Sequence, residues 1–94
     1  MTVEQLALML GRRLEIVRQP NTALGDPWQA SINGAEIKDG AMLSGAYGRG
    51  VTPMEALSHY CTLIAGRTLV LNAYRESRTE INAPADLTAQ AMKS

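Results

Sequence analysis

The stretch from Gly48 to Glu55 constrains the fold of this chain most, because it marks where a helix begins. Thr52 is a favoured N-cap residue, whose hydroxyl accepts a hydrogen bond from a backbone amide of the first turn. Pro53 suits the first helical position, where no N–H is needed, and Glu55 completes a capping box near the positive end of the helix dipole. These signals predict a helix that begins at Thr52, directly after a strand that ends in glycine.

The predicted helix is amphipathic. Apolar side chains recur at three- and four-residue steps, which is the spacing of one buried helix face, and Gly66 is the expected left-handed end. Ser58, His59 and Thr62 lie off this face and are predicted to be exposed. The predicted buried residues are Ala56, Leu57, Tyr60, Cys61 and Ile64.

The segment before this helix is predicted to form an antiparallel sheet. Apolar residues alternate with polar ones from Trp28 to Ile32, as in a half-buried strand. The pairs Asn33-Gly34 and Asp39-Gly40 favour tight hairpin turns, because both positions tolerate positive φ. We therefore expect a meander of three strands, over residues 28–32, 35–38 and 41–47.

Both ends of the chain carry further elements. Thr2 and Gln5 have the spacing of a capping box, so a helix is predicted within residues 1–19, where residues 15–19 either continue it or are already extended. Residues 20–27 form a breaker-rich loop.

After the central helix, β-forming residues predict strands over 68–74 and 79–82, and the tail 85–94 forms a weak helix or frays. The expected fold class is α+β, with an N-terminal helix, three strands, a central helix and one or two further strands. We expect one domain, with the sheet and central helix at 28–84.

Composition limits the size and setting of this domain. With 94 residues, 46% apolar and 19% charged, the chain has room for one hydrophobic core. Aromatic residues are only 4% and Phe is absent, so we expect a light core to which homo-oligomer formation adds stability.

A formal charge of zero argues against a nucleic-acid partner. Cys61 is the only cysteine, and neither a basic leader nor a membrane span is present, which favours a cytoplasmic location.

The residues that could carry chemistry do not assemble into a site. Gly48-Arg49-Gly50 before a helix could bind an anion, but it matches neither the phosphate-loop nor the dinucleotide pattern, and a tight glycine turn explains it better. His59 and Cys61 are two positions apart on a helix and point in different directions. No carboxylate shows metal-ligand spacing. We therefore expect no enzyme, no metal and no cofactor.

A partner-binding surface is predicted from arginines and tyrosines instead. Arg suits bidentate contacts and Tyr is a frequent interface anchor, although the residues near the last strands could equally form a solvated hairpin balanced by Glu76 and Glu80. The candidate partner-binding residues are Tyr47, Arg49, Arg67, Tyr74, Arg75 and Arg78.

The order of elements resembles the core of HicB-type antitoxins. A Gly-x-Thr-x-x-Glu-Ala run carries the resemblance at Gly50, Thr52, Glu55 and Ala56, and the late strand ends in residues 79–84. The chain is also similar to small phage proteins with a Gly-x-Gly-x-Thr-Pro helix start followed by Gly-Arg-Thr-Leu-Val.

The resemblance implies a small non-enzymatic protein of a phage or mobile element, in the host cytoplasm. We expect it to inhibit a host or defence protein by occupying its surface, and to form a homodimer through sheet-edge pairing. One alternative is a nucleic-acid-binding domain of α-β-β-β-α type, and another is a HicB-like antitoxin module. A third is an enzyme that uses Cys61, or a protein with a small-molecule ligand site.

Overall fold

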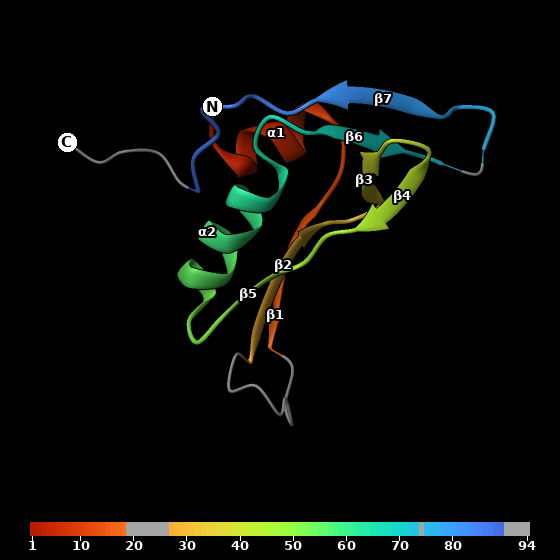
Figure 1. Ribbon diagram of the computed structural model, residues 1–94. Helices are drawn as coiled ribbons and strands as arrows, with labels where there is room; N and C mark the ends of the chain where they lie inside the picture. Colours follow the sequence, from red (N-terminus) through yellow and green to blue (C-terminus); the bar gives the residue numbers. More distant parts are fainter. Residues whose placement is uncertain (19–26, 74, 90–94) are drawn as a thin grey trace.

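The structure is a computed structural model that describes residues 1–18, 27–73 and 75–89. The chain is α+β, as predicted, with its strands in two antiparallel sheets (Figure 1). One sheet has the strand order β1-β2-β5 and the other has the order β4-β3-β6-β7. The elements in chain order are α1 (Val3–Met9), β1 (Leu14–Arg18), β2 (Trp28–Ile32), β3 (Ala35–Asp39), β4 (Met42–Gly45), β5 (Gly48–Gly50), α2 (Pro53–Ile64), β6 (Thr68–Leu71) and β7 (Thr79–Asn82).

The two sheets are joined by a pair of bent chain segments. β2 pairs with β5 up to Ala30 opposite Gly48, and β3 pairs with β4 from Glu36 opposite Gly45. Five residues, 31–35, therefore lie opposite only two, 46 and 47. The two segments separate at this point, where each passes from one sheet to the other.

This arrangement corrects the expected three-strand meander. Gly34 has the positive φ of +75° expected of a turn, but the turn is a corner between two sheets and β2 does not pair with β3. The strand expected over 41–47 is shorter, because β4 covers only Met42–Gly45, and a separate strand, β5, follows at Gly48–Gly50. The second turn is a true hairpin: Asp39 pairs with Met42, and Gly40 has a φ of +61°.

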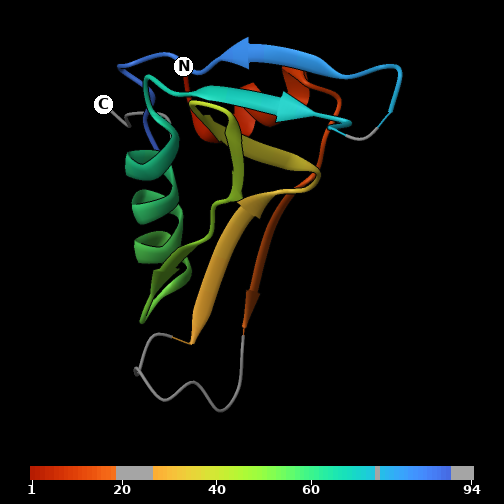
Figure 2. The ribbon, with the colours of Figure 1, turned by 45° about the vertical axis from the view of Figure 1, so that its right-hand side comes forward.

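The helix start at Thr52 is confirmed, and α2 is the main cover of the core. The Thr52 hydroxyl accepts a hydrogen bond from the amide of Glu55 at 3.1 Å. All five residues of the predicted stripe are buried. α2 contacts β5 and β2 most extensively and lies along the β1-β2-β5 sheet (Figure 2).

The prediction for the N-terminal helix was right about its cap and wrong about its length. The capping box of Thr2 and Gln5 is present, but the helix expected over residues 1–19 ends at Met9. Gly11, with a φ of +67°, lies between it and β1, so the extended alternative for residues 15–18 is the correct one. Residues 19–26, which hold most of the predicted loop, lie outside the described residues.

The C-terminal segment is not helical as far as it is described, which is residue 89. It lies against the start of the chain instead: the Val3 amide donates to the Thr88 carbonyl at 2.9 Å, and the Thr88 amide donates to the Met1 carbonyl at 3.0 Å. Leu87 is buried in the core cluster. The weak helix expected over 85–94 is therefore wrong for residues 85–89, and residues 90–94 are outside the described part.

Candidate protein-interaction face

One face of the β1-β2-β5 sheet packs against α2, and the opposite face carries mostly polar side chains. Ala30 and Ile32 are buried, so the alternate residues of β2 point away from the core. Gln29 lies between Val17 of β1 and Arg49 of β5 in the strand register, and Ser31 lies opposite Glu15. We call this surface the outer face; its members are Glu15, Val17, Gln29, Ser31 and Arg49.

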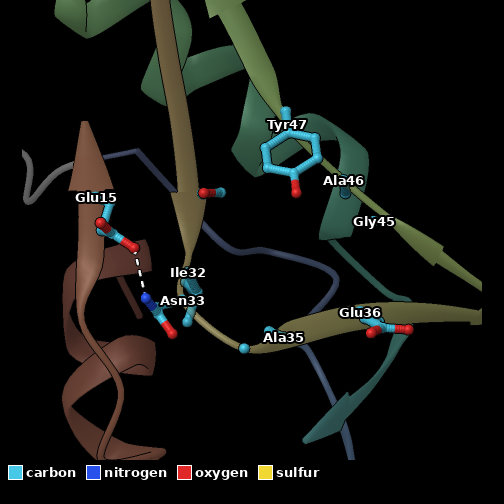
Figure 3. A pocket seen from close by; sticks show the side chains of 10 residues that line it. Glu15, Ile32, Asn33, Ala35, Glu36, Gly45, Ala46 and Tyr47 are labelled. Carbon is cyan, nitrogen blue, oxygen red and sulfur yellow. Dashed lines mark hydrogen bonds between the residues drawn. The ribbon is translucent and has the colours of Figure 1, made fainter. Parts of the chain in front are cut away.

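A pocket of about 350 Å³ opens at the edge of the outer face, where the two sheets separate (Figure 3). Glu15 and Glu36 are the two charged residues of its lining, and Tyr47 forms part of its wall. The Asn33 side chain donates a hydrogen bond to Glu15 Oε1 at 2.7 Å. The pocket is therefore polar and acidic, with an aromatic ring at its side.

Tyr47 stands at this pocket with half of its surface exposed. Its relative exposure is 50%, and its ring lies so close to Gly45 that a Cβ there would be 3.3 Å from Tyr47 Cε2. Arg49 lies two residues further on, exposed on the outer face. The two residues that the sequence singled out before the helix are thus two positions apart: Tyr47 lines the pocket with Glu15 and Ser31, and Arg49 lies opposite Gln29 on the outer face.

Tyr60 of α2 supports the corner from the core side. Its hydroxyl accepts a hydrogen bond from the amide of Ile32 at 3.1 Å. If β2 and β5 continued to pair, this amide would face residue 46. Their pairing has already ended at Ala30 and Gly48. The buried phenol therefore takes the place of a missing strand partner, and burial raises its pKa above the usual value.

The outer edge of β5 is covered by side chains from α2. The Arg49 amide donates to Nδ1 of His59 at 2.9 Å, and the Val51 amide donates to Glu55 Oε2 at 3.0 Å. Glu55 and His59 are four residues apart, so they lie on one side of the helix. This corrects the expected capping box, because Glu55 binds the amide of Val51 and not that of Thr52. The His59 bond was missed, since only the i, i+4 spacing with Glu55 could have suggested it.

The remaining predicted site residues lie elsewhere. Arg67 precedes β6, whereas Arg75 and Arg78 follow it at the other end of the β6–β7 hairpin. Arg67 therefore does not share a basic face with Arg75 and Arg78, and Tyr74, which the sequence placed among them, lies outside the described residues.

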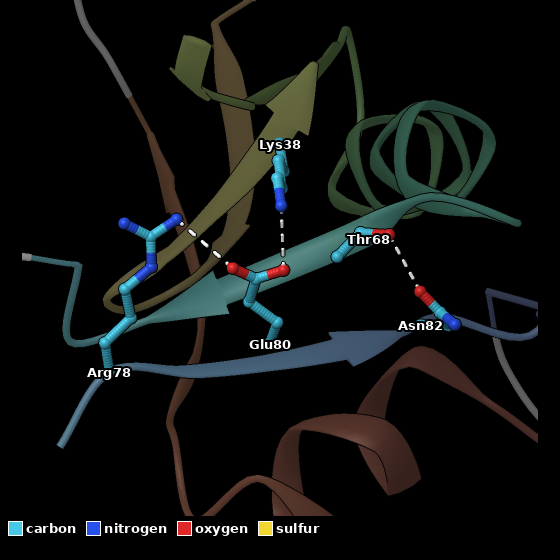
Figure 4. Close-up of polar contacts among 5 residues, drawn as sticks. All are labelled: Lys38, Thr68, Arg78, Glu80 and Asn82. Carbon is cyan, nitrogen blue, oxygen red and sulfur yellow. Dashed lines mark hydrogen bonds and ion pairs between the residues drawn. The ribbon is translucent and has the colours of Figure 1, made fainter. Parts of the chain in front are cut away.

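Arg78 is part of a charge network across the hairpin (Figure 4). Its Nη2 lies 3.2 Å from Glu80 Oε2, and Lys38 Nζ lies 3.1 Å from Glu80 Oε1. These groups are exposed, which supports the alternative of a solvated hairpin.

The groups with catalytic potential are separated. Cys61 is buried, its Sγ donates to the Leu87 carbonyl at 3.0 Å, and burial raises the pKa of its thiol. Across residues 1–18, 27–73 and 75–89, no three His, Cys, Asp or Glu side chains gather as metal ligands would. None of the described helices has the length and apolar character needed to cross a membrane.

Comparison of the chain with protein-family models, with curated proteins and with solved structures finds no match. The geometry of the outer face is therefore the basis for any functional conclusion.

Proposed function

We propose that this chain is a small non-enzymatic binding protein that inhibits a host or defence protein by occupying its surface, and that it is encoded by a phage or mobile element. The observation that supports this proposal is the outer face, which carries Arg49, together with the open polar pocket at its edge, which Tyr47 lines. Tyr and Arg are the residue types that most often carry binding energy in protein interfaces.

The charge of this face is mixed, which suits a protein partner. Arg49 supplies a cation, while Glu15 and Glu36 supply carboxylates around the pocket. Interfaces between proteins commonly combine an aromatic anchor with a polar rim of both signs. The Tyr47 ring lies over Gly45 and is half exposed, so a partner can cover it.

A capture experiment with two matched variants tests the proposal. The folded wild-type chain is immobilised on a support and incubated with host lysate. The double variant Tyr47→Ala/Arg49→Ala and the control Arg67→Ala/Arg75→Ala are treated in the same way. The control changes exposed residues that flank β6 of the other sheet. We expect one protein to be retained by the wild type and the control, and lost with the first double variant. Failure of the folded wild type to retain any protein would contradict the function, and equal retention by both variants would contradict this face.

The arginines give less support to nucleic-acid binding. A nucleic-acid backbone requires several cations on one continuous surface. Arg67 lies at one end of the β6–β7 hairpin and Arg75 at the other, while Arg78 is paired with Glu80. Nucleic-acid binding and the HicB-like antitoxin role therefore stay predictions from the sequence.

A further inference from the structure

β1 presents backbone hydrogen-bonding groups on its outer side. The Asn33 amide donates to the Arg13 carbonyl at 2.8 Å, which fixes the odd-numbered residues of β1 as those bonded to β2. The amides and carbonyls of Leu14, Ile16 and Arg18 consequently point away from the sheet. In the part of the chain that the structure describes, no strand pairs with this side (Figure 2).

The two edges of this sheet differ in protection. Side chains of α2 bind the outward amides at β5, as His59 does for Arg49. β1 instead carries Ile16 and Val17 at its centre, with exposures of 36% and 40%. Natural edge strands usually carry charges, proline or a covering element at such positions, and an apolar open edge is a site for pairing.

An apolar groove continues the core beyond this edge. Leu14 and Ile16 lie opposite the buried Ile32 and Ala30, so their side chains are on the core side of the sheet. A groove of about 620 Å³ runs there between β1 and α1. Its lining is mostly apolar and includes Leu8, which is 73% exposed, while Glu4, Arg12 and Arg13 add charge to it. A strand added to β1 would place its inward side chains in this groove.

We propose that β1 pairs with β1 of a second copy of this chain, antiparallel and about a two-fold axis at Ile16. In this register Ile16 lies opposite Ile16 of the second copy, and Leu14 lies opposite Arg18. The outward backbone amides and carbonyls of one copy therefore lie opposite those of the other and can bond to them. α1 of each copy lies on the same side of the joined sheet, so Leu8 and Ile16 become covered. The formal charge of zero leaves no long-range repulsion between two copies. This inference goes beyond the proposed function and does not depend on it.

The sequence of β1 selects this register over its neighbours. A shift of two residues in one direction places Glu15 opposite Glu15, and like charges directly opposite are unfavourable. A shift of two residues in the other direction leaves Leu14 and Glu15 beyond the end of the partner's β1, which stops at Arg18, so fewer residues pair. With Ile16 on the axis, Glu15 lies opposite Val17 and no like charges meet.

Sedimentation across a concentration series tests the dimer. We expect the wild type to reach twice the mass of one chain, and Ile16→Lys, which places two ammonium groups on the axis, to stay monomeric. Met42→Lys is the matched control on β4, where the side chain is 74% exposed, and should still dimerise. Ile16→Pro replaces the side chain and removes an amide that points away from β2, so it should also be monomeric and folded by circular dichroism.

A wild type that remains monomeric at every concentration would overturn the proposal and leave the edge to an extended segment of a different protein. Dimers formed by the folded Ile16→Lys and Ile16→Pro variants would also overturn it. Should Ile16→Pro not fold, Ile16→Lys decides the question.

Oxidative cross-linking tests the register. In a Cys61→Ser background, Ile16→Cys places two thiols on residues whose Cα atoms are about 5.5 Å apart in a hydrogen-bonded pair, which suits a disulfide. We expect a disulfide-linked dimer. The control Glu15→Cys places the two residues diagonally, about 7–8 Å apart, and should remain monomeric on a non-reducing gel. Cross-linking of Glu15→Cys without Ile16→Cys would exclude this register.

Discussion

Gly48 packs against the backbone of α2 so closely that a Cβ at position 48 would lie 2.5 Å from the Cβ of Tyr60. It would come nearer still to the carbonyl oxygen of Ala56. The glycine is thus required by the approach of the helix to β5, and its φ is not in the left-handed region. Gly50 has the same relationship to Glu55 one turn earlier on α2.

We expect Gly48→Ala to lower the free energy of unfolding by about 3 kcal/mol, because α2 must move away from β5. The control is Gly45→Ala, where the new methyl group would meet only the movable ring of Tyr47, at 3.3 Å. Urea unfolding of both variants measures the difference. Similar stabilities would show that α2 can shift without cost.

Removal of the Tyr60 hydroxyl should also destabilise the protein. Tyr60→Phe leaves the amide of Ile32 without its acceptor in the core, which costs about 2 kcal/mol. Tyr47→Phe is the matched control, because its ring is half exposed and we expect a change below about 0.5 kcal/mol. The same urea titration compares them, and equal values would place water at the Ile32 amide.

Alkaline pH should destabilise the fold through Tyr60. Burial raises the pKa of Tyr60 above the ordinary value near 10, so the folded state holds its proton where the unfolded state releases it. The stabilisation of the fold by protonated Tyr60 is complete below about pH 10 and is lost as the pH rises further. Between pH 9 and 11, the melting temperature should fall more steeply with pH for the wild type than for Tyr60→Phe. Parallel curves would contradict the assignment.

The thiol of Cys61 should react slowly in the folded protein. The thiolate is the reactive form, and burial raises the pKa of this thiol while its Sγ donates to the Leu87 carbonyl. We expect modification by a disulfide reagent at neutral pH to be at least about tenfold slower than in urea. Equal rates would mean that the segment around Leu87 opens readily.

Acid should weaken the β6–β7 hairpin through Glu80. The hydrogen bond from Lys38, followed by the charges of Lys38 and Arg78, lowers the pKa of this carboxyl. Its stabilising contribution is therefore present above the ordinary pKa of Glu, about 4.3, and is lost as pH falls through the folded value. Glu80→Gln should flatten the loss of stability between pH 5 and 3 at low salt, whereas Glu76→Gln, with no ion pair to a described residue, should not.

The sequence by itself determined both helix starts and the buried face of α2. Thr2 and Thr52 cap through bonds to residues three positions away, and the stripe from Ala56 to Ile64 follows the helical period. These features depend on neighbours along the chain, so they can be predicted without the fold. The left-handed end at Gly66 belongs to the same class.

Only the tertiary structure decided which strands pair and which side chains meet. The turn at Asn33-Gly34 looked like a hairpin, yet β3 pairs with β6, so that Ala35 lies opposite Leu71. Arg67 and Arg75 are close in sequence but lie at opposite ends of a hairpin, while Glu15 and Tyr47, which are distant in sequence, line one pocket. Strand pairing depends on partners and core contacts that are distant in the sequence, and a local pattern of turn and β-forming residues is compatible with several partners.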